Sequence, residues 1–194
     1  MKKSFFAVAV MLLASTSVFA QYDWMKSSLL VGYTKENCSD VVEYSNKFGV
    51  GVQFNETFDV FEFVDNRISL GLDTSFDVNY SQFTDHGTIH MGEVSVQVGP
   101  AVTFRPVDKL GIHLYAKIAP AIVAQHLSDA DKGYANLGLM SVCGASVSYG
   151  RVGLGFEQRG GNVNFREIRD SKLLDGTAKS TDFVGPRIYL VLGL

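Results

Sequence analysis

The sequence predicts an all-β protein whose fold is an eight-stranded antiparallel up-and-down transmembrane β-barrel. Three observations lead to this prediction. After residue 20 the chain has no run of 18 apolar residues, so no membrane-spanning helix is expected. Apolar residues instead recur at every second position along eight segments. The residues between them are mostly small, with charges of both signs.

The N-terminus has the pattern of a secretory signal peptide. Lys2 and Lys3 precede an apolar run over residues 5–13, and the small residue Ala20 precedes Gln21. This run is shorter than the about 20 residues that a membrane-spanning helix needs. We therefore expect residues 1–20 to be a signal peptide and residues 21–194 to form one β-barrel domain.

Charge and cysteine content exclude two classes of protein. The formal net charge is −3, and loss of Lys2 and Lys3 with the signal peptide makes it −5. An acidic exported chain lacks the basic surface that nucleic-acid binding requires. Cys38 and Cys143 are too few for a small disulfide-stapled scaffold, so we expect both thiols to be free.

Four segments in the first half of the domain alternate in the manner of strands. Residues 28–34 form a short segment. Residues 47–55 set Phe and Val against Gly and Gln, and residues 67–79 set Ile, Leu, Phe and Val against Ser, Gly and Asp. The clearest segment is 92–104, where valines oppose Glu, Ser, Gln and Thr. Each pattern predicts a strand with one apolar face.

Four more segments follow in the second half. Residues 110–122 alternate throughout, and residues 137–149 alternate less clearly because Ser141 interrupts the apolar face. Residues 151–160 set Val, Leu and Phe against Gly, Glu and Arg, and residues 182–194 end in alternating Ile and Leu. The total of eight is even, as in bacterial barrels that cross a membrane.

The connections between these segments alternate in length. Short turns are expected near 105–109 and 149–151, whereas 55–66 is long and aromatic and does not fit the alternation. Loops on a rigid scaffold commonly carry recognition. We therefore expect function in the long polar connections, which are 35–46, 79–90, 126–136 and 160–180.

Composition indicates which way the apolar faces point. Eight amphipathic strands can close with the apolar face inward, as in a soluble lipocalin-type carrier, or outward, as in a membrane barrel. The polar face is rich in Gly, Ala and Ser, which suit the narrow interior of an eight-stranded barrel. Charges on that face can pair with one another. We therefore predict an ion-pair network in the lumen, formed by Asp73, Asp77, Glu93, Lys117, Glu157, Arg159 and Arg187.

Lys117 tests this orientation because it lies within an aliphatic run, LYAKIAPAIV. On the lipid face near the midplane its ammonium would cost about 2–4 kcal/mol. We expect Lys117 to face the lumen, with a partner among Glu93, Glu157, Asp73 and Asp77. Aromatic residues near strand ends are expected to form two interfacial girdles, and these are Trp24, Tyr33, Phe54, Phe58, Phe76, Tyr80, Phe104, Tyr149 and Phe183.

The last strand, PRIYLVLGL, alternates through Ile188, Leu190 and Leu192 and ends on Leu194. Together with the strands before it, this pattern resembles the small outer-membrane β-barrel family of the OmpA and OmpX type and the PorT-like proteins of the porin family. The resemblance covers residues 21–194 and rests on the pattern. The family usually ends on Phe or Trp, and this chain departs from it by ending on Leu.

The resemblance implies a protein of the cell outer membrane that contacts outer-membrane lipid and is inserted by the barrel-assembly machinery. We expect a monomer with an unknown extracellular partner, bound through the long connections, and no nucleic-acid partner. The alternatives are a small porin-like channel and a secreted soluble lipocalin-like ligand-binding barrel.

The histidines do not form a recognisable catalytic or metal-binding motif. His86 and His90 are placed in one long connection, His126 at the start of another, and His113 inside the lumen. The chain has no Gly-x-Ser-x-Gly signature, and His86 and His90 lack a third ligand at metal-site spacing. The sequence therefore predicts no enzyme, no cofactor and no metal, but a structural or surface-interaction protein.

Overall fold

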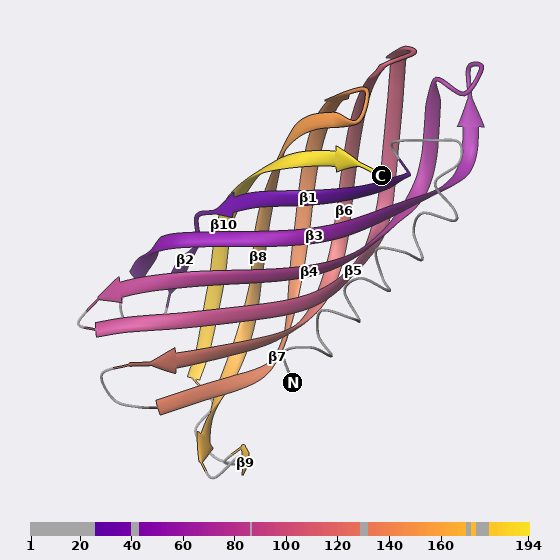
Figure 1. Ribbon diagram of the computed structural model, residues 1–194. Helices are drawn as coiled ribbons and strands as arrows, with labels where there is room; N and C mark the ends of the chain where they lie inside the picture. Colours follow the sequence, from indigo (N-terminus) through magenta and orange to yellow (C-terminus); the bar gives the residue numbers. More distant parts are fainter. Residues whose placement is uncertain (1–25, 40–42, 86, 129–131, 170–171, 174–178) are drawn as a thin grey trace, which may run out of the picture.

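The computed structural model describes residues 26–39, 43–85, 87–128, 132–169, 172–173 and 179–194. The expected signal peptide at 1–20 lies outside these ranges. Within them, no helix is long and apolar enough to cross a bilayer. Figure 1 shows long, strongly tilted strands that follow one another around the molecule.

The strands pair antiparallel in chain order and close into a ring. Their bounds are β1 Ser27–Thr34, β2 Asn37–Ser39, β3 Glu43–Phe63, β4 Ile68–Asp85, β5 Gly87–Val107, β6 Leu110–Leu127, β7 Lys132–Tyr149, β8 Val152–Arg169, β9 Lys172–Leu173 and β10 Lys179–Gly193. β1 pairs with both β3 and β10, which closes the ring.

The ten segments amount to eight strands of the barrel. β1 and β2 lie in line between β10 and β3, and the gap is bridged where the Lys35 N–H donates to the Pro186 carbonyl at 2.9 Å. β9 is a two-residue pairing at the end of β8. The predicted fold, an all-β eight-stranded antiparallel up-and-down barrel, is confirmed.

At one end of the barrel the connections are tight. The β5–β6 link is Asp108–Lys109, and Gly150 has a φ of 59° in the β7–β8 turn. In the β3–β4 turn Val64, Asp65 and Asn66 all have left-handed φ values, between 51° and 63°. The expectation of a long 55–66 connection was wrong, because β3 continues to Phe63 and only a short turn remains.

The expected long connections at the other end were also largely wrong. Most of 79–90 is the hairpin of β4 and β5, and most of 126–136 belongs to β6 and β7. Of 160–180, β8 takes the part up to Arg169 and β10 begins at Lys179, while 35–46 contains β2 and the start of β3. His90 and His126 therefore lie in strands and not in loops.

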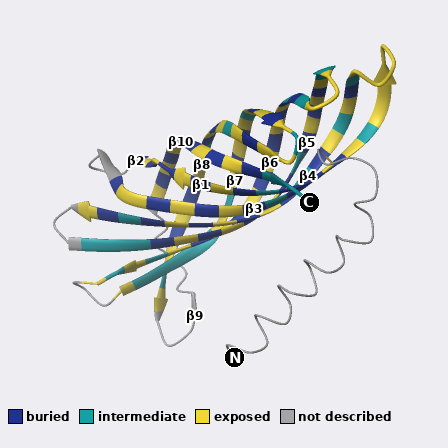
Figure 2. Ribbon diagram, turned by 45° about the horizontal axis from the view of Figure 1, so that its top comes forward, coloured by how far each residue is buried: buried dark blue, intermediate teal, exposed yellow. Residues whose placement is uncertain are grey.

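Near the hairpin end of these strands, the inward residues become apolar and the outward residues become polar. This inversion explains why the strand ends were predicted as loops. In β4, Leu72, Phe76 and Val78 point outward and Asp77 points inward, whereas beyond Tyr80 it is Phe83 that is fully buried. Figure 2 shows alternate buried and exposed residues continuing along the strands. The alternation persists while the two faces exchange character, so the strand is uninterrupted although its composition becomes loop-like.

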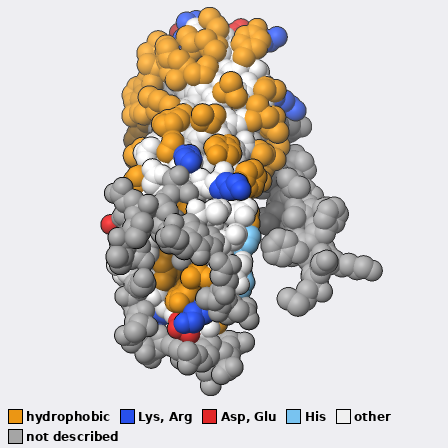
Figure 3. All heavy atoms as spheres, turned by 90° about the vertical axis from the view of Figure 1, so that its left-hand side faces the viewer, with side chains coloured by type: hydrophobic (Ala, Val, Ile, Leu, Met, Phe, Trp, Pro, Cys, Tyr) orange, Lys and Arg blue, Asp and Glu red, His pale blue; other side chains and the backbone are white. Residues whose placement is uncertain are grey.

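The outward face of the main barrel is an apolar band. Its exposed side chains include Val52, Leu72, Val96, Ile118 and Leu154. Hydrophobic side chains dominate the upper part of the face in Figure 3. On β8 the outward apolar residues of the band are Val152, Leu154 and Phe156, and the outward polar residues Gln158 and Asn162 follow toward the hairpins.

Most aromatic residues expected in the girdles do point outward. Tyr33, Phe58, Phe76, Tyr149 and Tyr80 are exposed, as is Phe104, and Phe54 is partly exposed. Trp24 lies outside the described residues. Phe183 was wrongly assigned to a girdle: it is 4% exposed and points inward, because it lies where the polarity pattern has already inverted.

Candidate functional site in the lumen

The structure places all seven of the predicted network residues inside the barrel. Each is at most 3% exposed. They come from five strands, which are β4, β5, β6, β8 and β10. The structure brings the charges together in an arginine group and a lysine group, which share the central part of the lumen.

The arginine group is built around Asp77. Arg187 holds its carboxylate in a bidentate pair, with Nη1 to Oδ1 at 2.8 Å and Nη2 to Oδ2 at 3.0 Å. Arg159 donates from Nη2 to Asp77 Oδ2 at 3.0 Å and to Glu93 Oε1 at 2.5 Å. Glu157 Oε1 lies 3.3 Å from Arg187 Nη1 and 3.6 Å from Arg159 Nε. Bidentate charge-assisted bonds of this kind fix geometry as well as energy.

The lysine group explains how an ammonium is accommodated within an aliphatic run. Lys117 Nζ lies 3.3 Å from Asp73 Oδ2, one of its four expected partners. It also donates to Asn55 Oδ1 at 2.6 Å and to Ser75 Oγ at 3.0 Å. The Tyr115 ring centroid lies 4.2 Å from Nζ, within cation–π range. The charge is thus fully solvated by protein groups.

Asp73 also joins a chain of hydrogen bonds through His113. Its Oδ2 lies 2.9 Å from His113 Nε2, and Thr103 Oγ1 lies 2.9 Å from His113 Nδ1. Thr57 donates to Asp73 Oδ1 at 2.5 Å. A hydroxyl, an imidazole and a carboxylate therefore stand in the order found in hydrolytic triads.

Two tyrosines connect the groups and fill the space between them. Tyr115 donates to Glu157 Oε2 at 2.7 Å, and its hydroxyl lies 2.9 Å from that of Tyr189. Each ring lies over a cross-strand glycine, Tyr115 over Gly144 and Tyr189 over Gly155. A Cβ at either glycine would lie within 2.4 Å of the ring above it, so any larger residue would displace that tyrosine.

Sequence reasoning missed several members of the network. Glu36 was placed in a connection, yet it accepts from Ser81 at 2.6 Å and lies 3.8 Å from Arg159. Asn55 was the end of an expected strand and in fact lies mid-strand, where it binds Lys117. The signal that could have found Asn55 is its even spacing from Gly51 and Gln53. Glu36 has the same signal, because it keeps the inward phase of Gly32 and Thr34.

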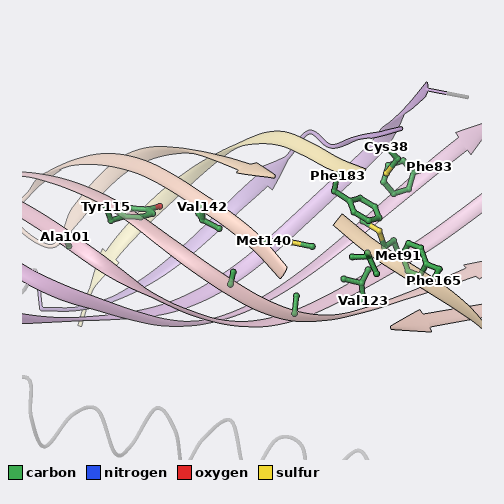
Figure 4. Close-up of a cluster of buried hydrophobic side chains, with 13 residues drawn as sticks. Cys38, Phe83, Met91, Ala101, Tyr115, Val123, Met140, Val142, Phe165 and Phe183 are labelled. Atoms are coloured by element: carbon green, nitrogen blue, oxygen red, sulfur yellow. The ribbon is translucent and has the colours of Figure 1, made fainter. Parts of the chain in front are cut away.

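Toward the end of the barrel with the long hairpins, the lumen contains apolar side chains instead of charges. Phe165 and Phe183 pack edge to face with centroids 5.9 Å apart. Figure 4 shows them near Cys38, Phe83 and Met91. We call this the outer cluster, and it consists of Cys38, Phe83, Met91, Val123, Phe165 and Phe183, all at most 4% exposed.

The histidines and cysteines outside the network were also candidates for metal binding. Among the described residues, no group of three or more His, Cys, Asp or Glu side chains is placed to hold a metal ion. His86 lies outside those residues. Cys38 and Cys143 are both free thiols, as expected, and Cys143 is exposed on the outward face.

Comparison with known proteins supports the fold. No protein-family model matches the sequence, and no curated protein is similar to it. The crystal structure of Neisserial surface protein A (NspA) is similar, with a TM-score of 0.56 and 12% identity over 87% of this chain and 97% of that one.

Two further solved structures resemble the chain more weakly. They are Ail, the attachment invasion locus protein of Yersinia pestis, with a TM-score of 0.45, 15% identity and coverage of 84% and 97%, and the outer membrane enzyme PagL, with 0.42, 13% and coverage of 87% and 99%. The closed ring of strands and the similarity to NspA, at an identity where only the fold can be compared, together show that the chain has the fold of the small eight-stranded outer-membrane β-barrel proteins.

Proposed function

We propose that this chain is an integral outer-membrane barrel with a side-chain-filled lumen, and that it acts at the cell surface through its long external hairpins. The observation that carries the proposal is the filled interior. The charged network occupies the central lumen and the outer cluster closes the end toward the hairpins. A rigid, plugged barrel is suited to presenting a surface.

A small porin-like channel is the first alternative. A cavity lies at the end of the lumen nearest the described chain ends. It has a volume of only ≈ 20 Å³, and Ser28, His113 and Ser146 are among the residues that line it. A cavity of that size holds about one water molecule. A cavity this small, next to the buried charged network, supports a closed lumen and not a steady channel.

A secreted soluble lipocalin-like barrel is the second alternative. Such a barrel would expose polar residues and enclose apolar ones. Here Ile118, Ile122, Leu139 and Leu154 are each more than half exposed, while Asp77 and Glu157 are fully buried. The arrangement is suited to a hydrocarbon surrounding.

Absence of enzymatic activity also belongs to this proposal. Thr103, the hydroxyl of the triad-like chain, is 2% exposed, and the adjoining cavity is too small for a substrate. A nucleophile needs space where the reacting carbonyl and its oxyanion donors can lie. We propose that Thr103 and His113 serve to orient Asp73 toward Lys117.

The proposed partners follow from the same picture. The barrel contacts outer-membrane lipid through the apolar band, and the barrel-assembly machinery inserts it. Beyond the band the hairpins carry outward polar residues such as Gln82, Thr84, Asn164 and His126. These polar faces are the proposed recognition surface for an extracellular partner.

Cell fractionation and planar-bilayer recording together test the proposal. We expect the protein only in detergent-extracted outer membrane, and we expect the refolded barrel to give no steady large conductance beside a porin control. Recovery as a soluble monomer without detergent would favour the lipocalin-like alternative. A wide, steady current would make a small porin the better description.

A further inference from the structure

A groove crosses the outward face where β6, β7, β8 and β10 lie side by side. It has a volume of ≈ 530 Å³, and the walls are Ile118, Leu139 and Val184. These three side chains are 58%, 61% and 52% exposed. The groove therefore lies within the apolar band, on the surface that faces lipid if the proposed function is correct.

The strand register explains why the surface is hollowed at this point. Ile118, Ser141, Gly160 and Val184 form one row across the four strands, so a small residue and a glycine stand between two large ones. Ser141 donates its hydroxyl to the Gly160 carbonyl at 3.2 Å and leaves no unpaired polar group on the groove floor. The floor is thus apolar in effect.

One end of the groove is polar and carries a negative charge. In the next row, toward the hairpins, Asn162 lies opposite Asp182. The Asn162 amide donates to Asp182 Oδ1 at 2.6 Å and to Ser180 Oγ at 2.6 Å, and all three residues are exposed. The Asp182 carboxylate forms no ion pair with any other residue that the structure describes, and its partner is the neutral Asn162 amide.

An apolar groove that ends in a carboxylate is complementary to one kind of molecule. A lipid acyl chain fits between Ile118, Leu139 and Val184, and a cationic head group then reaches Asp182 at the edge of the band. A primary ammonium donates three hydrogen bonds, whereas a quaternary ammonium donates none. We propose that this groove is a binding site for one membrane lipid that carries a primary ammonium group in its head.

The glycines provide both the test and its control. A Cβ built on Gly160 meets only the Val184 side chain at 3.2 Å and the Phe183 carbonyl at 3.6 Å, so Gly160→Leu fills the groove at small cost. A Cβ on Gly92 meets nothing within 4 Å. Gly92 is an exposed strand glycine on β5 and does not line the groove, so Gly92→Leu is the matched control. Asp182→Asn removes the charge alone.

The experiment is native mass spectrometry of the folded protein with an equimolar mixture of phosphatidylethanolamine, phosphatidylcholine and phosphatidylglycerol of identical acyl chains. We expect the wild-type chain and Gly92→Leu to retain one phosphatidylethanolamine, preferred about two- to fivefold over phosphatidylcholine. Gly160→Leu should retain at least about tenfold less lipid. Asp182→Asn should bind both zwitterionic lipids equally.

Three results would overturn the lipid site. Equal lipid retention by all variants would indicate ordinary surrounding lipid. Preference for phosphatidylglycerol would contradict the charge complementarity. A dimer that is lost on Gly160→Leu would indicate that a second copy occupies the groove. In all three cases the protein would still be a folded barrel that requires detergent. A chain that is folded and soluble without detergent would instead contradict the proposed function itself.

Discussion

Lys117 illustrates how a single residue can reveal the orientation of a barrel. Its neighbours Ala116 and Ile118 are exposed on the outward face, while Tyr115 and Ala119 share its inward side. The alternation of β6 left only two possible placements, and the cost of a charge in hydrocarbon excluded one of them. The identity of its carboxylate partner was less predictable, because partner choice depends on barrel register and not on strand pattern.

Lys117→Met should destabilise the barrel by about 3–5 kcal/mol, since it leaves the Asp73 carboxylate buried without its cation. Combining it with Asp73→Asn should recover at least about 1 kcal/mol relative to the sum of the single changes. Urea unfolding in lipid vesicles measures both values. Ile118→Met, an apolar exchange at the adjacent outward position, is the control and should change stability by less than about 1 kcal/mol.

Asp77 and Glu93 should differ sharply although both are buried carboxylates in one group. Asp77 uses both oxygens, on two arginines, whereas Glu93 Oε2 has no hydrogen-bond partner among the described residues. Asp77→Asn should therefore cost about 3–5 kcal/mol, and Glu93→Gln less than about 1 kcal/mol. Equal unfolding free energies for the two variants would contradict the central place assigned to Asp77.

At the scale of the elements, the strands are longer than the bilayer requires. A tilted membrane strand needs about 9–11 residues, and β5 has 21. The part beyond the apolar band is a small water-facing structure with its own apolar interior, the outer cluster. The apparent loops of the sequence are therefore pairs of strands whose inside and outside have exchanged polarity.

Phe165→Ala should loosen this outer part while leaving the membrane portion intact. The phenyl ring is 3% exposed and packs against Phe183, so its removal leaves a cavity, a change that typically costs about 3–5 kcal/mol. Limited proteolysis of the folded barrel should yield faster cleavage in the hairpins, with heat-modifiable migration retained. Unchanged cleavage rates would contradict the view that the outer cluster holds the hairpins.

The hairpin direction gives a separate prediction. With both termini on the periplasmic side, Ser128 lies outside the cell and Asp108 inside the periplasm, because this type of barrel has its longer connections outside. In a chain with Cys38→Ala and Cys143→Ser, an impermeant maleimide on whole cells should label Ser128→Cys and not Asp108→Cys. The opposite labelling would invert the proposed topology.

The sequence predicted the strand phases well and the strand ends poorly. Each central segment kept its phase, including 137–149, where Met140 and Val142 do face inward and Ser141 outward. The two-residue period of a strand depends only on neighbouring residues, so it can be read from the sequence. The charged residues could therefore be assigned to the inward face. The ends of β3, β4 and β8 could not be predicted, because pairing beyond the band depends on the outer cluster, whose members come from distant strands.

For the molecule as a whole, closure of the ring is the decisive property. Every strand has partners on both sides through the central barrel, so no unpaired edge is available to water or detergent there. The folded protein should migrate faster than its boiled form on a denaturing gel. Identical migration before and after boiling would indicate that the ring is not closed in solution.

The seam at which the two ends of the chain meet has a mechanical consequence. β1 is held to β10 only over Ser28–Thr34, whereas β10 is held to β8 from Lys179 to Leu192. Under a pulling force applied at the N-terminus, the short ladders of β1 bear the load first and share it among the fewest hydrogen bonds. Single-molecule extraction from a membrane should therefore begin with release of β1 at low force, followed by larger rupture steps as the long hairpins leave in pairs.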